Sequence, residues 1–355
     1  MSRFFSGRYD ALEPYTPGEQ PQDMQYVKLN TNESPFPPSP GVAAAVAAEL
    51  DRLQLYSDPE SRILTGKLAA YYGLRPGQVI LGNGSDEVLN FACMAFADEK
   101  RPLVFPDITY GFYPVFAQLN RIPYREIPLT EEFRVDIRDY LGGGHTVLLA
   151  NPNAPTGIAL GLEEIEAVVA GNPDNVVIVD EAYVDFGAQS AVRLLDRYDN
   201  LLVTGTFSKS RSMAGARLGF ALGDEALIRD LNTLKYSTNP YNVNRMSSAA
   251  GAAALEEDAY YQANCRTIQT NRAFTAAALE RMGFEVLPSQ ANFLFACHAD
   301  WDGGELYRRL KARGVLVRHF AKPRIKDFLR ISIGTAEQME RFLQTLQQIM
   351  EEGRG

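Results

Sequence analysis

Short apolar runs alternate with segments of helical periodicity along the chain, and this alternation constrains the fold more than any other feature. Such alternation is typical of a mainly parallel sheet that is covered by helices. We therefore predict an α/β fold. The apolar runs are Val79–Leu81, Leu103–Phe105, Thr146–Ala150, Val176–Val179, Leu201–Thr204 and Leu218–Leu222.

The pattern divides the chain into three parts. Residues 1–39 are rich in proline and polar residues and read as an extended arm. Residues 40–248 hold the alternating pattern and form the predicted large domain. Residues 249–355 begin with an alanine-rich helical stretch that reaches Met282, and we expect them to form a smaller α/β domain beside the arm. Its predicted strands lie near Phe284–Val286, Ala291–Ala296, Val315–Arg318 and Phe328–Ile333, before a closing helix.

Composition and charge narrow the class of protein. The chain has 355 residues, of which 46% are hydrophobic, and its net charge of -9 argues against a nucleic-acid surface. Cys93, Cys265 and Cys297 lie far apart and match no metal spacing, so no metal site is predicted. The start lacks the long apolar stretch of a secretory signal, and no run of about 18 apolar residues occurs. We expect a cytoplasmic protein that acts on a small molecule.

The segment GNGSDEVL, residues 82–89, follows an apolar run and precedes a predicted helix. Gly84 allows a tight turn, while Ser85 and Asp86 lie in the first helical turn, where backbone N–H groups lack partners. The helix dipole favours an anion there, and the serine hydroxyl can add a donor. The segment predicts a phosphate site, although the same residues also form ordinary capped turns.

In VVIVDEAYVDF, residues 176–186, Asp180 follows an apolar run at the carboxyl end of a predicted strand. Ligands of open α/β sheets bind at this edge. A buried carboxylate is costly without a cationic partner, and the protonated nitrogen of a bound ring would provide one. Tyr183 could donate to a phenolic oxygen of the same ring. Without such a ligand, Asp180 could equally cap a turn.

The segment NLLVTGTFSKSRSMAGARLGF, residues 200–220, leads from a strand into Lys209. An amine at the end of a buried strand can act as a nucleophile and form a Schiff base. The hydroxyls of Thr206 and Ser208 and the guanidinium of Arg217 supply donors for a phosphate monoester. Without these neighbours, a Ser-Lys pair is an ordinary surface feature.

Two further segments carry weaker signals. LLANPNAPTGIAL, residues 148–160, is a strand followed by a proline-rich turn that contains Asn153. FPDITYGFYPV, residues 105–115, contains Tyr110, whose ring could lie on a flat heteroaromatic ligand. Each could also be ordinary turn or core.

Taken in order, these five segments resemble the pyridoxal-phosphate (PLP) dependent aminotransferases of the aspartate aminotransferase fold, over nearly the whole chain. The resemblance implies that Lys209 carries PLP as a Schiff base, that Asp180 pairs with the pyridine nitrogen, and that Tyr183 bonds the phenolic oxygen. The family usually has asparagine directly before Pro-Thr-Gly, where this chain has Ala154, and Asn153 is the candidate to compensate. The remaining implied cofactor residues are Gly84, Ser85, Asp86, Tyr110, Thr206, Ser208 and Arg217.

Within this family the chain is most similar to histidinol-phosphate aminotransferases. The likeness rests on KLNTNESPFPPSP at 28–40, YSDPES at 56–61 and LRISIGT at 329–335. It implies a homodimer in which Tyr56 enters the partner's site beside the cofactor. It also implies that Tyr15, Arg318 and Arg330 recognise the substrate, and two neighbouring arginines suit a phosphate monoester.

The implied reaction moves an amino group from histidinol phosphate to PLP and then to 2-oxoglutarate, as a step of histidine biosynthesis. Three other functions remain open at this point. The same cofactor residues would serve an aromatic amino acid aminotransferase or a threonine-phosphate decarboxylase. A transcription regulator is disfavoured, because residues 1–39 are too few for a DNA-binding domain and are not basic.

Overall fold

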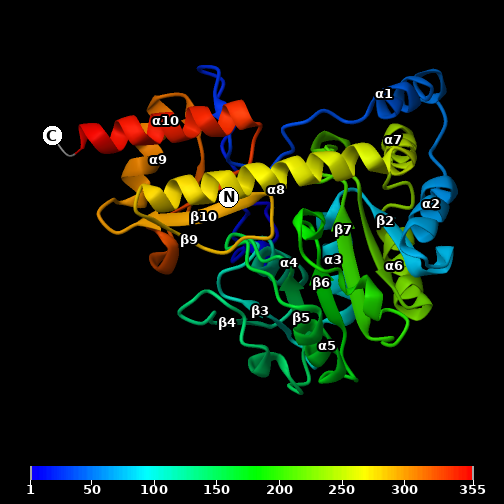
Figure 1. Ribbon diagram of the computed structural model, residues 1–355. Coiled ribbons are helices and arrows are strands. Elements are labelled where there is room, and N and C mark those ends of the chain that lie inside the picture. The colour runs from blue at the N-terminus through cyan, green and yellow to red at the C-terminus, as the bar shows by residue number, and fades with distance from the viewer. Residues whose placement is uncertain (1, 354–355) are drawn as a thin grey trace.

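The computed structural model describes residues 2–353, and a large sheet of mainly parallel strands lies at their centre (Figure 1). Within this part of the chain the sheet has seven strands in the order β2-β8-β7-β6-β5-β3-β4, and β8 alone runs antiparallel to its neighbours. The predicted α/β fold is confirmed. The strands are β2 (Val79–Gly82), β3 (Leu103–Pro106), β4 (Tyr124–Ile127), β5 (Thr146–Ala150), β6 (Val177–Asp180), β7 (Leu201–Thr206) and β8 (Gly219–Gly223).

Helices cover both faces of this sheet, which explains why its strands are apolar throughout. On β6, Val177 and Val179 pack into one core cluster while Ile178 packs into the other. The first cluster joins the sheet to α1 (Pro40–Ala47), α2 (Arg62–Tyr72), α5 (Leu162–Ala170) and α7 (Arg245–Glu256). The second joins it to α3 (Ser85–Phe96), α4 (Tyr113–Asn120) and α6 (Glu225–Thr238).

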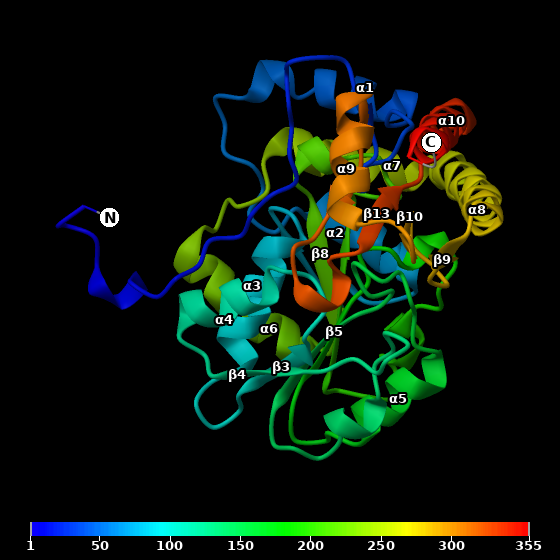
Figure 2. The same cartoon turned by 90° about the vertical axis from the view of Figure 1, so that its left-hand side faces the viewer.

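A smaller antiparallel sheet forms a second core with the C-terminal helices, seen at the upper right of Figure 2. Its strand order is β12-β13-β10-β9. The arm joins this part of the molecule, because β1 (Val27–Lys28) pairs in parallel with β11 (Val315–Leu316). The remaining elements are α8 (Asp258–Arg281), β9 (Phe284–Val286), β10 (Phe293–His298), α9 (Gly303–Ala312), β12 (Arg318–His319), β13 (Phe328–Ser332) and α10 (Ala336–Glu352).

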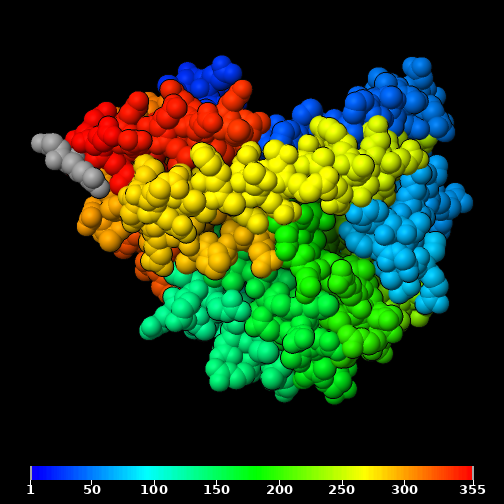
Figure 3. All heavy atoms as spheres, in the orientation of Figure 1, coloured from blue at the N-terminus to red at the C-terminus, as the bar shows by residue number. Residues whose placement is uncertain are grey.

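The helix α8 connects the two parts and crosses one face of the molecule as a continuous band (Figure 3). The alanine-rich stretch that was expected to form one helix is broken at Glu257, whose ψ of 34° leaves the helical region. Since α7 packs against α1 and α8 runs on toward the small sheet, the division at residue 248 stays a prediction.

The helix α1 ends at Ala47, and a short 3-10 turn follows at Leu50–Arg52. Two further details differ from the sequence interpretation. The edge strand β4 was not predicted, because its pattern is mostly exposed. The strand expected at 315–318 is two short strands in different sheets. No helix in the described part of the chain is long and apolar enough to cross a membrane.

Candidate active site

Two adjoining cavities lie where the large sheet, the arm and the small sheet meet. The inner cavity has a volume of about 470 Å³ and the outer cavity about 550 Å³. Both are lined by Thr31, Tyr110, Ala154, Tyr183 and Lys209. The inner cavity also contains Ser85, Asp86, Asp180, Thr206, Ser208 and Arg217, and the outer cavity contains Tyr15, Arg318 and Arg330.

Asp180 is the last residue of β6, and its buried carboxylate reaches the inner cavity. The hydroxyl of Tyr113 donates to Oδ2 at 2.9 Å, and the hydroxyl of Thr204 donates to Oδ1 at 3.3 Å. Burial nevertheless raises the pKa of Asp180 to about 6. A cationic ligand group beside this carboxylate would favour its ionised form. The site thus holds a buried carboxylate suited to a positively charged ring nitrogen.

Hydroxyl and guanidinium donors gather at the N-terminus of α3. Gly84 adopts φ +86°, and a Cβ there would lie 2.4 Å from Nη2 of Arg217. Arg217 donates to Asp86 Oδ2 at 3.1 Å, and the Tyr110 hydroxyl donates to Asp86 Oδ1 at 2.9 Å. With Ser85 in the first turn of the helix, this arrangement offers the donors that a phosphate group would need.

Two more hydroxyls belong to this phosphate cradle. Thr206 ends β7, and its hydroxyl lies 2.9 Å from Oγ of Ser208. Behind them, Gly219 of β8 comes so close to α3 that a Cβ would lie 2.2 Å from the backbone nitrogen of Ser85. Any side chain at Gly219 would therefore displace the cradle.

Lys209 lies between the two cavities and donates from Nζ to the carbonyl oxygen of Thr31 at 3.2 Å. Its Nζ is 5.7 Å from the centre of the Tyr183 ring. Because the lysine contacts both cavities, it can reach a cofactor in the inner one and a substrate in the outer one.

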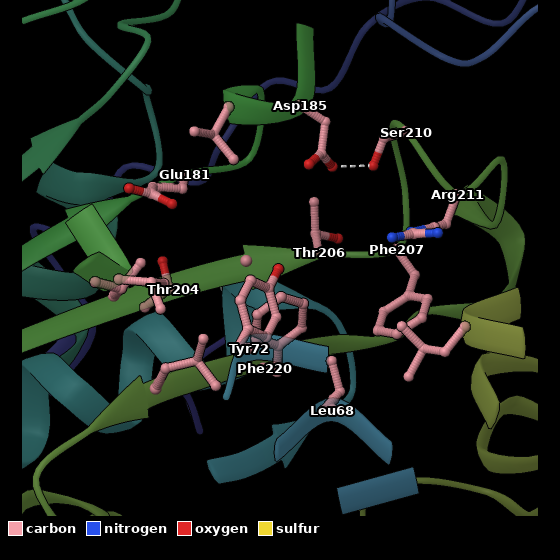
Figure 4. Close-up of a pocket in the computed structure, with 16 residues that line it drawn as sticks. Leu68, Tyr72, Glu181, Asp185, Thr204, Thr206, Phe207, Ser210, Arg211 and Phe220 are labelled. Atoms are coloured by element: carbon pink, nitrogen blue, oxygen red, sulfur yellow. Dashed lines mark hydrogen bonds between the residues drawn. The ribbon is translucent and has the colours of Figure 1, made fainter. Parts of the chain in front are cut away.

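The residues that follow Lys209 contact side chains that line a further polar cavity, and these contacts anchor the loop (Figure 4). The Ser210 hydroxyl donates to the carboxylate of Asp185. Arg211 is buried, pairs with Asp258 at 2.5 Å and lies 5.2 Å from the centre of the Tyr71 ring. These contacts hold the loop in one position.

Two arginines face the outer cavity beside Tyr15. Arg330 donates from Nη2 to the carbonyl oxygen of Asn30 at 2.9 Å. Arg318 donates to the carbonyl oxygens of Thr16 and Pro17 at 3.1 and 3.2 Å, so it also holds the arm over the site. The outer cavity thus offers two guanidinium groups to an anionic substrate.

Three of the residues predicted from the sequence, Gly84, Asn153 and Tyr56, do not line either cavity. Asn153 was expected to bind the cofactor, and its amide bonds the segment that follows β3: Oδ1 accepts from Thr109 at 2.7 Å, and Nδ2 donates to Ile108 O at 2.9 Å. A role of Asn153 at the cofactor stays a prediction. Tyr56 is 80% exposed and stacks on Tyr241, with ring centres 4.5 Å apart.

Sequence reasoning also missed several residues of the site. Tyr113 and Thr204 bond the Asp180 carboxylate, and Thr31 bonds Lys209. A further bond joins Asn32 to Tyr183 across 151 positions of sequence. Thr204 could have been identified from its position on the strand that leads to Lys209. Among the described residues, no group of acidic, cysteine and histidine side chains is arranged to hold a metal ion.

Comparisons with known proteins identify the family of this chain. The model of the aminotransferase class I and II family matches residues 24–346. The histidinol-phosphate aminotransferase of Acinetobacter baumannii is 50% identical over 350 residues, which cover 98% of this chain and 97% of that protein.

Two solved structures share the fold. A histidinol-phosphate aminotransferase from Sinorhizobium meliloti, in complex with pyridoxal-5'-phosphate, superposes with a TM-score of 0.85 at 24% identity, covering 92% of each chain. An L-threonine-O-3-phosphate decarboxylase from Porphyromonas gingivalis gives 0.80 at 21% identity, covering 91% of this chain and 99% of that one. The fold alone therefore does not separate these two activities. The family match and the full-length relative do assign the chain: it belongs to the aminotransferase class I and II family.

Proposed function

We propose that the protein is a PLP-dependent aminotransferase that takes the amino group from histidinol phosphate and passes it to 2-oxoglutarate, in histidine biosynthesis. The assignment of the substrate rests on one observation: Arg318 and Arg330 both line the outer cavity, next to Lys209. The full-length relative in Acinetobacter supports the same substrate.

The residues of the inner cavity fit PLP. Asp180 would hold the pyridine nitrogen, because this buried carboxylate lacks a cationic partner among residues 2–353. Ser85, Thr206, Ser208 and Arg217 would hold the phosphate at the N-terminus of α3. When bound, PLP supplies an aldehyde that exchanges amines and a ring that accepts the electron pair of the Cα–H bond.

Different side chains of this chain would perform the separate steps of the reaction. Lys209 would bind the cofactor covalently, and after the substrate amine displaces it, its free amine would take the proton from Cα. Asp180, stabilised as a carboxylate by Tyr113 and Thr204, would keep the ring nitrogen protonated. Tyr110 would lie against the ring, and Tyr183 would donate to its phenolic oxygen.

Substrate recognition would occur in the outer cavity. The phosphate group of histidinol phosphate would bind Arg330 and Arg318, which offer fork-shaped donors. The carboxylates of 2-oxoglutarate would use the same arginines in the second half of the reaction. Tyr15 closes this cavity from the arm, and its ring lies 4.7 Å from that of Phe112.

We further propose a homodimer in which Tyr56 completes the partner's site. Tyr56 lines neither cavity of its own chain, and the surrounding surface exposes Leu53, Leu55 and Ile63. A test is to mix the Tyr56→Ala and Lys209→Ala variants after unfolding them together. Mixed dimers would regain one complete site, whereas activity no greater than that of the two separate variants would contradict the shared site.

A cytoplasmic location is part of the same proposal. Histidinol phosphate carries charges that make passage through a bilayer costly, so the enzyme would meet it where it is made.

The first experiment is a single-turnover measurement without any keto acid. PLP-loaded protein is mixed separately with histidinol phosphate, phenylalanine and phosphothreonine, and the visible absorbance of the bound cofactor is followed together with the products. The matched control is Lys209→Ala.

The proposal predicts rapid conversion of the cofactor to its amine form with histidinol phosphate alone. Conversion mainly with phenylalanine would instead identify an aromatic aminotransferase. Release of carbon dioxide from phosphothreonine would identify a decarboxylase. Absence of a visible band after addition of PLP would contradict the assigned cofactor.

A further inference from the structure

A chain of hydrogen bonds with a fixed direction ends at the hydroxyl of Tyr183. It begins at the backbone nitrogen of Asn32 in the arm, which donates to Oγ of Ser332 at 2.8 Å. A backbone N–H can only donate, so the serine oxygen is the acceptor. Its own hydrogen then donates to Oδ1 of Asn32 at 2.8 Å. These two bonds fix which end of the Asn32 amide faces which neighbour.

The remaining end of that amide faces Tyr183. Nδ2 of Asn32 lies 3.1 Å from the hydroxyl oxygen of Tyr183. An amide nitrogen donates and does not accept, so the tyrosine oxygen is the acceptor here. Within residues 2–353, the Tyr183 hydroxyl donates to no protein group, and the side chain lines the inner cavity. Its proton is therefore available to a ligand.

Several contacts fix the backbone around Asn32. Asn32 is 1% exposed and adopts φ +56°, a conformation that asparagine tolerates better than most residues. Its carbonyl oxygen accepts from Nδ2 of Asn292 at 2.9 Å. The preceding carbonyl, of Thr31, accepts from Lys209. The arm is thus anchored on both sides of the Tyr183 contact.

We propose that Asn32 is a positioning residue that directs the Tyr183 proton into the inner cavity, so that Tyr183 acts as a hydrogen-bond donor to the phenolic oxygen of PLP. This inference rests on the proposed function. Ala154, which lines the same cavity, has a methyl side chain and no donor, which increases the dependence on Tyr183. The arm and the small sheet thereby act on the cofactor through Tyr183.

The consequence is spectroscopic. A donor to the phenolic oxygen stabilises the anionic form of that oxygen. The bound cofactor should then change its visible absorbance at a lower pH than it would without the donor. Losing the bond from Tyr183 should raise the midpoint of this absorbance titration by about one pH unit.

The test compares pH titrations of the visible absorbance in PLP-loaded variants. Asn32→Gly removes the amide while keeping a residue that adopts positive φ without strain. Asn32→Asp keeps the shape but replaces the donor by an oxygen that accepts the Tyr183 proton. Tyr183→Phe gives the largest shift of the midpoint that loss of the Tyr183 donor can cause. Asn30→Ala is the matched control, because this buried amide of the same arm bonds Glu19 and not Tyr183.

The inference predicts a raised midpoint in Asn32→Gly, a larger rise in Asn32→Asp, and no change in Asn30→Ala. The double variant Asn32→Gly with Tyr183→Phe should match Tyr183→Phe alone. A midpoint shifted by Tyr183→Phe but by neither Asn32 variant would overturn the role of Asn32 and leave the proposed function intact. An unshifted midpoint in Tyr183→Phe would overturn the role of Tyr183, and this inference with it.

Discussion

Replacing Arg330 by glutamine should slow the reaction of a phosphorylated substrate far more than that of its unphosphorylated counterpart. In the structure, Nη2 of Arg330 is bound to Asn30, and the guanidinium carbon lies 5.4 Å from the centre of the Phe293 ring. Within residues 2–353, its Nε and Nη1 donate to no protein acceptor. The residue therefore keeps donors for a ligand in the outer cavity.

The expected loss follows from the bonds that glutamine cannot replace. Two hydrogen bonds to a charged group contribute about 3 to 4 kcal/mol, which corresponds to about a 100- to 1000-fold lower kcat/KM. With histidinol, which lacks the phosphate, the same substitution should cost less than about threefold, since nothing charged is left to bind.

The assay is the first half-reaction in single turnover, with histidinol phosphate and histidinol as donors. Keto acid is left out because 2-oxoglutarate carries carboxylates that would also bind Arg330. Arg324→Gln is the matched control: it removes an equal charge from an arginine that bonds Asp107 and lines neither cavity. Thermal unfolding checks that the variants are folded. Equal losses with the two donors would refute the assignment of Arg330 to the phosphate.

Three further predictions concern other parts of the molecule. Asp180→Asn should slow the first half-reaction on the order of 100-fold, because a neutral amide does not favour a protonated ring nitrogen; a rate within about threefold of the wild type would contradict the pairing. Gly219→Ala should weaken PLP binding by about 10- to 100-fold in equilibrium dialysis, since a Cβ would lie 2.2 Å from the Ser85 nitrogen, and unchanged affinity would show that the cradle lies elsewhere. Burial raises the pKa of Glu181 from 4.5 to about 8. Between these two pH values the folded protein binds a proton that the unfolded chain lacks. The free energy of unfolding should therefore fall by a few kcal/mol as the pH rises from 4.5 to about 8. Glu181→Gln should remove that fall in urea titrations, and an unchanged pH dependence would contradict the prediction.

The residues that could be predicted from the sequence follow strand ends. Asp180 and Lys209 were identified because an apolar run places them at the carboxyl edge of a parallel sheet, where side chains from neighbouring strands converge. Gly84 and Ser85 were identified because a glycine turn before a helix is a local pattern. Such features depend on short stretches of chain, and the structure brings them together as expected.

The remaining features depend on contacts that the sequence does not encode locally. A turn rich in asparagine does not reveal which way each amide points, so the sequence could not show that the Asn153 amide bonds Thr109 and Ile108. Asn32 contacts Tyr183 only because the arm folds back onto the small sheet, where the Asn32 backbone bonds Ser332 of β13. The edge strand β4 has three exposed residues out of four, so it lacks the apolar run that identified its neighbours.

Covalent trapping tests whether Lys209 carries the cofactor. PLP-loaded protein is reduced with borohydride, digested, and analysed by mass spectrometry to locate the attached cofactor. We expect attachment to the peptide that contains Lys209, and loss of that attachment when histidinol phosphate is added before the reduction. Attachment to a different lysine, or none at all in protein that has bound PLP, would show that Lys209 does not carry the cofactor.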